Sequence, residues 1–129
     1  MTEAIKVLVV DDQELFREIA RAMFEVTGEF TVVAEAADGL DAVSAYLEHS
    51  PDLVLMDIQM ARMNGIEATR EIRTHDPNAS VILISMKADL EYQRVAMELG
   101  AIGFIAKRDL DPISLKMLVD GSIAGENAA

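Results

Sequence analysis

Residues 51–65 read Pro-Asp-Leu-Val-Leu-Met-Asp-Ile-Gln-Met-Ala-Arg-Met-Asn-Gly, and this stretch decides the fold. Its apolar run, residues 53–56, is unbroken and is typical of a strand that is buried on both faces. Asp57 follows at once, so we expect it where the strand leaves the core. A carboxylate in that place either keeps a strand end soluble or is a positioned functional group. Its neighbours elsewhere in the chain decide between the two.

Composition limits the class of protein. The chain has 129 residues, of which 51% are hydrophobic, and this suits one compact domain over residues 1–129. It has no cysteine, which excludes disulfides and thiolate metal sites and fits a reducing cytoplasm. The net charge of -12 repels nucleic-acid phosphates and favours cations and basic protein partners. The first apolar run, Ile5–Val10, is interrupted by Lys6 and is too short for a signal or membrane segment, so we expect a soluble cytoplasmic protein.

Strand and helix patterns alternate along the chain. The expected strands cover residues 5–10, 31–36, 53–56, 81–84 and 104–105, and the expected helices cover 15–27, 40–48, 66–73, 89–99 and 112 to about 123, with a frayed tail after that. The apolar positions that define the first two helices include Leu15 and Ile19, then Leu40 and Leu47. Short connections between these elements predict an α/β fold with a doubly wound parallel sheet of five strands and five helices. Ligands of such sheets bind beyond the carboxyl ends of the strands.

Polar side chains follow four of the five expected strands at that edge. They are Asp11 and Asp12 after the first strand, Asp57 after the third, Ser85 after the fourth and Lys107 after the fifth. Each alone has an ordinary explanation as a helix cap, a loop cap or a surface charge. Two carboxylates about 4 Å apart repel by roughly 4 kcal/mol at an effective dielectric constant near 20, so three of them need a compensating cation. Mg²⁺ prefers such oxygen ligands and leaves room for a phosphoryl oxygen.

This set of side chains suits phosphoryl transfer. Asp57 would be the nucleophile, Lys107 and the metal would neutralise charge on the phosphoryl oxygens, and Ser85 would hydrogen-bond the product. An aspartyl phosphate adds nearly two negative charges, which is enough to draw a hydroxyl group and its loop inward. The modification would then act as a conformational signal.

These residues resemble the receiver domain of two-component response regulators over essentially the whole chain. The resemblance implies a flavodoxin-like sheet with strand order 2-1-3-4-5, Asp57 as phosphoacceptor, Asp11 and Asp12 as the acidic pair, Ser85 as switch hydroxyl and Lys107 as the site lysine. It also implies Mg²⁺, with Mn²⁺ as a substitute, as cofactor, and a sensor histidine kinase or phosphotransfer protein as partner. Such a domain promotes its own phosphorylation and the hydrolysis of its aspartyl phosphate but is not a conventional enzyme.

Further roles rest on the same resemblance. The main-chain carbonyl of Gln59, two residues after the phosphoacceptor, would be a metal ligand, and Phe104 would be the aromatic switch. The fourth helix, fifth strand and fifth helix would form the surface that contacts an output domain or a dimer partner. Residues 100–107 look most like receivers that precede a helix-turn-helix DNA-binding domain. None follows, so we expect a stand-alone regulator or the receiver part of a longer protein, without direct nucleic-acid or membrane contact of its own.

Other functions remain open at this stage. The residues Ala61, Met86 and Arg108 depart from common receiver residues, which leaves a degenerate receiver that acts only as an interaction module as the alternative. A dehalogenase-type phosphatase would need an acid in place of Gln59. A flavin-binding module would need a hydroxyl- and glycine-rich phosphate loop, where the chain has acids at 11–12. Lys87, two residues after Ser85, would reach the mouth of the site and alter the rate of dephosphorylation.

Overall fold

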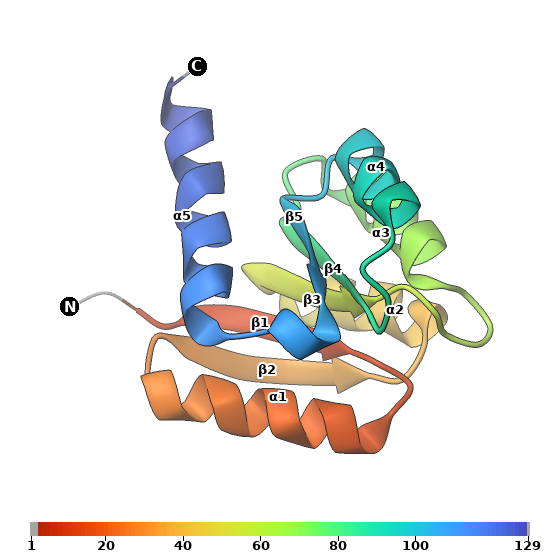
Figure 1. Cartoon of the computed structure of the whole chain (residues 1–129), viewed down its shortest axis with the longest axis horizontal. Coiled ribbons are helices and arrows are strands. Elements are labelled where there is room, and N and C mark those ends of the chain that lie inside the picture. Colours follow the sequence, from red (N-terminus) through yellow and green to blue (C-terminus); the bar gives the residue numbers. More distant parts are fainter. Residues whose placement is uncertain (1–2, 129) are drawn as a thin grey trace.

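The computed structural model describes the backbone of residues 3–128 and the side chains of residues 3–121. Within these residues the chain forms five strands and five helices in strict alternation (Figure 1). The strands are β1 (Ile5–Val10), β2 (Phe30–Ala36), β3 (Leu53–Asp57), β4 (Val81–Ser85) and β5 (Gly103–Ala106). The helices are α1 (Glu14–Thr27), α2 (Gly39–His49), α3 (Gly65–His75), α4 (Leu90–Leu99) and α5 (Pro112–Ala128), with a 3-10 turn at Lys107–Asp109.

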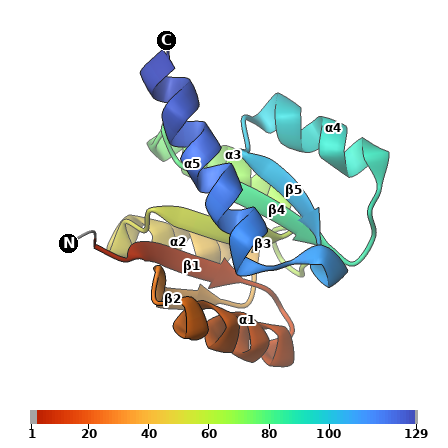
Figure 2. The ribbon, with the colours of Figure 1, turned by 60° about the vertical axis from the view of Figure 1, so that its left-hand side comes forward.

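The sheet is parallel and has the order β2-β1-β3-β4-β5, which confirms the predicted fold class. One apolar layer lies between the sheet and α2, α3 and α4, and includes Tyr46, Ile72 and Ala96. The other lies between the sheet and α1 and α5, and includes Phe24 and Leu115. Figures 1 and 2 show the helices on these two sides of the sheet. Because both faces are covered, β3 and β4 are buried along their whole length, as their apolar runs predict.

Capping residues fix where several helices begin and end. The side chains of Asp38, Asn64 and Asp89 accept hydrogen bonds from backbone N–H groups in the first turns of α2, α3 and α4. Gly28 and Gly100 follow α1 and α4 in the left-handed conformation that such ends require. The capped helices end close to the neighbouring strands, so the connections are short, and the parallel pairing of the strands brings their carboxyl ends to the same edge of the sheet.

The packing of α1 and α2 differs from the sequence prediction. Leu15 and Ile19 are 68% and 56% exposed, and Leu40 and Leu47 are also largely exposed, so these leucines and isoleucine are not core residues. In α2 the small Ala42 faces the sheet instead, because a short side chain lets the helix approach closely.

The last helix also runs further than expected. It continues to Ala128, although the sequence predicts an end near residue 123 and a frayed tail. Glycine lowers helix propensity by about 1 kcal/mol but, unlike proline, keeps its N–H donor, so the glycines at 121 and 125 do not stop the helix. The final residue of the predicted tail, Ala129, lies outside the described residues. Among the described helices, none is both long and apolar enough to cross a membrane.

Candidate functional site

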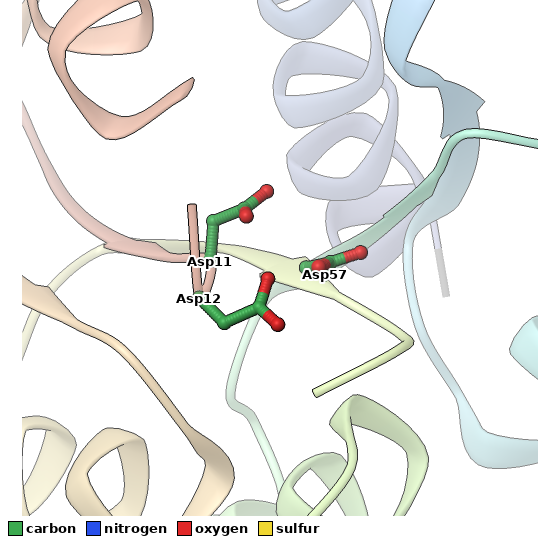
Figure 3. Close-up of side chains that lie close together, drawn as sticks. All are labelled: Asp11, Asp12 and Asp57. Atoms are coloured by element: carbon green, nitrogen blue, oxygen red, sulfur yellow. The ribbon is translucent and has the colours of Figure 1, made fainter. Parts of the chain in front are cut away.

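The acidic cluster forms at the carboxyl edge of the central strands. Asp11 and Asp12 follow β1, and Asp57 is the last residue of β3, so the β1–β3 pairing brings them side by side. One carboxylate oxygen of each lies within 4.8 Å of the others, and Figure 3 shows the three side chains grouped together. Gln59 and Lys107 line the same pocket, which has a volume of about 210 Å³. The structure thus gathers the predicted acids, amide and lysine at one place.

Lys107 lies inside the cluster and compensates part of its charge. Its Nζ atom is 2.6 Å from Oδ2 of Asp11 and 3.6 Å from Oδ2 of Asp57. The side chain is only 7% exposed, and Asp11 is fully buried, so this is a largely desolvated ion pair. Oδ1 of Asp11 accepts a hydrogen bond from the backbone N–H of Gln13 at 2.9 Å, which fixes the carboxylate.

Asp57 has an unusual protonation equilibrium because of this environment. Burial raises its pKa to about 6, and the charge of Asp11 adds to the rise. Lys107 opposes the rise, and the charge of Asp12 adds to it more weakly. The single ammonium therefore does not balance the acids, and the ionised cluster still favours a further cation.

The donor set fits Mg²⁺. Asp12 is exposed at the pocket and Asp57 is buried beside it, so both carboxylates can supply oxygens to one ion. Oδ2 of Asp11 is buried and, among the described residues, accepts no well-directed hydrogen bond apart from its contact with Lys107. An acidic, oxygen-only cluster of this kind suits a hard divalent cation better than a soft one.

The loop between β3 and α3, residues 58–64, is held in place by several contacts. The backbone N–H of Gly65 donates to the carbonyl oxygen of Ile58 at 2.9 Å, and that of Gly39 donates to Met63 at the same distance. Arg62 has a left-handed backbone with φ of +65°. Its Nε and Nη2 atoms donate to Oδ2 of Asp38 at 2.8 and 2.6 Å. This ion pair was not predicted, because no sequence pattern links residues that are 24 positions apart.

Glycine is required at the first position of α3. A Cβ atom on Gly65 would collide with the carbonyl group of Asp57 itself, and one on Gly39 would collide with the backbone of Met63. The start of α3 therefore lies directly against the end of β3. This close approach fixes the direction in which the chain leaves Asp57.

The predicted switch residues, Ser85 and Phe104, lie on the neighbouring strands β4 and β5. Ser85 ends β4, is 1% exposed and accepts a hydrogen bond from the backbone N–H of Lys87 at 3.2 Å. Phe104 pairs with Leu83 in the register of β5 on β4, and its ring centroid lies 6.4 Å from that of Tyr92 on α4. The hydroxyl of Tyr92 accepts a hydrogen bond from Nε2 of Gln59 at 3.0 Å. This bond joins the β3–α3 loop to α4, and no pattern in the sequence predicts it.

Of the three residues that depart from common receivers, Met86 lines the pocket and is 67% exposed, whereas Ala61 and Arg108 do not line it. The carbonyl of Ala61 accepts a hydrogen bond from the N–H of Met63 at 2.8 Å, so the loop turns there without a proline. Arg108 lies in the 3-10 turn after Lys107, and the peptide bonds of the described residues are trans.

The sequence matches one protein family over most of its length. The family profile described as the response regulator receiver domain matches residues 7–119. The chain is 35% identical to the transcriptional regulatory protein DegU of Brevibacillus brevis, over 91% of this chain and 51% of that protein. It is 39% identical to the chemotaxis protein CheY of Halobacterium salinarum, over 91% of this chain and 96% of that one. It therefore spans about half the length of DegU and nearly the whole of CheY.

Solved structures give the same result. A two-component response regulator of the LuxR family from Aurantimonas sp. SI85-9A1 has a TM-score of 0.84 and 36% identity, covering 95% of this chain and 86% of that chain. The structure of a CheX-CheY-BeF3-Mg²⁺ complex from Borrelia burgdorferi has a TM-score of 0.82 and 32% identity, covering 92% and 89%. Both likenesses extend over nearly all of the chain.

Proposed function

Because the chain belongs to the response regulator receiver domain family, we propose that Asp57 is the residue on which it accepts a phosphoryl group. The observation that carries this assignment is the position of Asp57, a buried strand-end carboxylate within reach of Lys107 and the two acids at 11–12. Its raised pKa, about 6, still leaves it mostly ionised at neutral pH and therefore able to attack phosphorus.

The transfer has a simple balance. A carboxylate oxygen of Asp57 forms a bond to phosphorus as the bond from phosphorus to the donor's imidazole nitrogen breaks, and the imidazole leaves with the electron pair. Lys107 stays near the transferred group and stabilises its oxygens. The signal ends by hydrolysis: water attacks phosphorus, and the Asp57 carboxylate leaves as inorganic phosphate forms. Both steps occur on the protein's own side chain, so the domain limits the lifetime of its signal.

Magnesium fits this role. Asp11, Asp12, Asp57 and the main-chain carbonyl of Gln59 would hold it, with Mn²⁺ as a substitute. When bound, the ion neutralises negative charge on the phosphoryl oxygens. The chain itself fixes the carboxylates and keeps Lys107 close to both Asp11 and Asp57.

Ser85 and Phe104 form the proposed switch. Ser85 lies at the end of β4, next to the pocket residue Met86, and its hydroxyl accepts from the N–H of Lys87, so its own O–H can donate to a new phosphoryl oxygen. Phe104 lies against Tyr92 of α4, so an inward shift of its ring would change the packing of that helix. Moving such an equilibrium from 1:99 to 99:1 takes about 5.5 kcal/mol, which several charge-assisted contacts can supply.

The partners follow from the family. We propose that a sensor histidine kinase or phosphotransfer protein supplies the phosphoryl group in the cytoplasm. The face made by α4, β5 and α5 would pass the signal to an output domain, a dimer partner or another protein. Relatives named as transcriptional regulators, such as DegU, support a role in transcription regulation. The acidic charge of -12 supports a route through protein contacts and not through DNA bound by this domain.

A labelling experiment tests the assignment. With acetyl phosphate and Mg²⁺, the wild-type protein should gain the mass of one phosphoryl group, and Asp57→Asn should gain none while keeping its circular dichroism spectrum. Asp109→Asn is the matched control, because Asp109 is an exposed acid near the site with its side chain 66% exposed. Labelling of Asp57→Asn would place the acceptor elsewhere. No labelling of the wild type would favour the phosphorylation-independent module.

A further inference from the structure

The ring of Phe16 contacts the charged end of the site lysine. Phe16 lies in the first turns of α1, and the Nζ atom of Lys107 is 4.6 Å from the centroid of its ring. The ring is half-buried and packs at the edge of the apolar layer that includes Leu55 and Ile84. Through Nζ of Lys107 the ring also contacts the ion pair between Lys107 and Asp11. One side chain touches both the core and the phosphorylation pocket.

We propose that Phe16 is a positioning residue for phosphoryl binding, acting through Lys107 by a cation–π interaction. The proposal rests on the proposed function of Asp57 and adds a residue to it. Lysine carries its charge on a flexible chain of four methylene groups, so the place of Nζ depends on what surrounds it. Here the ammonium lies between the Asp11 carboxylate on one side and the Phe16 ring on another, and 7% of the side chain is exposed.

The Phe16 ring matters most for the position of Lys107 when a cation binds the acidic cluster. In the structure Nζ is closer to Asp11, at 2.6 Å, than to Asp57, at 3.6 Å. A cation that binds the acids competes with Nζ for Asp11, so the ammonium then needs another partner that keeps it in the pocket. The negative face of the aromatic ring supplies one, and the ring is not an oxygen ligand for which a hard divalent cation would compete. The lysine thus stays beside Asp57, where the phosphoryl group arrives.

A purely structural role for Phe16 makes a different prediction. If the ring only fills space at the edge of the core, any apolar side chain of similar size would serve, and its loss would alter stability but not phosphoryl binding. A cation–π contact requires an aromatic face, so tyrosine would replace phenylalanine whereas leucine or methionine would not. Met23 offers a matched control on the same helix, because it packs against the same apolar layer.

The experiment measures the affinity for beryllofluoride in saturating Mg²⁺ by isothermal titration calorimetry, with thermal unfolding in parallel. We expect Phe16→Leu to weaken beryllofluoride binding about threefold to thirtyfold, the range of a cation–π contact. Phe16→Tyr should stay within about twofold of the wild type, and so should Met23→Ala despite its lower stability. Phe16→Met gives the same comparison if the leucine variant does not fold.

A second arm shows whether the effect passes through the lysine. In a Lys107→Met background, Phe16→Leu should change beryllofluoride affinity by less than about twofold. An equal loss with and without Lys107 would overturn the proposal, as would wild-type affinity in Phe16→Leu. If the wild type itself binds no beryllofluoride in Mg²⁺, the proposed function fails first, so the two failures are distinct.

Discussion

The β3–α3 loop, residues 58–64, and the β4–α4 loop, residues 86–89, border the same pocket but are held to very different degrees. The first is fixed by the Arg62–Asp38 ion pair and by backbone bonds at both ends. Among the residues that the structure describes, the second makes one hydrogen bond to the site, from the N–H of Lys87 to the hydroxyl of Ser85. Met86 in this loop and Leu90 just after it are 67% and 79% exposed.

The contrast separates two tasks of the domain. The fixed side, which we define as Asp11, Asp57, Lys107 and the β3–α3 loop, carries the groups that would meet the metal and phosphorus in the proposed function. The free side, the β4–α4 loop with Ser85, has few contacts to lose when it moves. A pocket built in advance lowers the cost of binding, and a loosely held loop lowers the cost of switching. The fold provides both because the two loops leave neighbouring strands.

The largest effect is expected from removing the lysine of the fixed side. Lys107→Ala leaves Asp11 buried without its counter-charge, and losing one partner of a buried ion pair costs about 3 to 5 kcal/mol. Chemical unfolding without Mg²⁺ should show this loss. Added Mg²⁺ should restore more stability to the variant than to the wild type, because it replaces the missing positive charge.

A variant as stable as the wild type in EDTA would show that the ion pair does not hold the fixed side together. Lys116→Ala is the control, because Lys116 pairs with Asp120 along one exposed helix face. We expect it to change stability little and to leave the response to Mg²⁺ unchanged.

The next effect is a dependence of stability on pH that comes from Asp57. Its folded pKa, about 6, lies above the ordinary value of 3.8, so the folded state holds the proton more tightly than the unfolded state. Stability without metal should therefore fall as pH rises from about 4 to 7, by roughly 2 kcal/mol from this group. Asp57→Asn should flatten that part of the profile and be more stable than the wild type at pH 7.

Equilibrium unfolding at a series of pH values in EDTA measures this. Asp38, Asp76 and Asp111 have lowered pKa values and act in the opposite direction, so their contribution is lost only as pH falls below about 4. Parallel profiles for the wild type and Asp57→Asn between pH 4 and 7 would contradict the raised pKa of Asp57.

A smaller effect is expected from loosening the β3–α3 loop. Arg62→Asn removes the ion pair with Asp38 but keeps a residue that tolerates the left-handed backbone. Because the loop carries the carbonyl of Gln59, we expect Mg²⁺ affinity to fall by up to about tenfold, the lower end for residues that orient metal ligands. Calorimetric titration with Mg²⁺ measures it, with Arg94→Gln on α4 as control. An unchanged affinity would mean that the backbone bonds alone fix the loop.

The smallest effect tests the link between the two sides. Tyr92→Phe removes only the hydroxyl that accepts from Gln59, while its ring contact with Phe104 remains. The loss of one exposed hydrogen bond should change the protection of α4 amides by about twofold to tenfold. Hydrogen exchange with and without beryllofluoride measures this protection. If the beryllofluoride-induced change in α4 is identical in both proteins, the bond does not couple the sides.

The fold and the position of the acidic cluster could be predicted from the sequence. Apolar runs such as that of β3 identify buried strands, and a parallel sheet brings their carboxyl ends together, so Asp57 and Lys107 had to meet. Which face of each helix packs on the sheet was predicted less accurately. The pattern marked Leu40 and Leu47 in α2, although Ala42 and Tyr46 face the sheet. Periodicity counts apolar residues but does not weigh the small ones that allow close packing.

The missed residues of the site have a common property. Arg62, Phe16 and Tyr92 act through side chains that reach residues far away in sequence. Phe16 has the spacing of an ordinary core residue, and the position of the Lys107 ammonium over its ring is visible only in the three-dimensional structure. Tyr92 lies on α4, but the partner of its hydroxyl, Gln59, lies in the β3–α3 loop. Such contacts depend on rotamers, which residue patterns do not encode.

The absence of a side chain at position 65 has a consequence for laboratory evolution. Since a methyl group there would displace the carbonyl of Asp57, a saturation library selected for phosphorylation should return a single amino acid at that codon, and nearly the same at position 39. Exposed positions such as 86 would accept many replacements. Mutational tolerance around the pocket would thus trace the boundary between its immobile and its adjustable half, and could be read from sequencing counts alone.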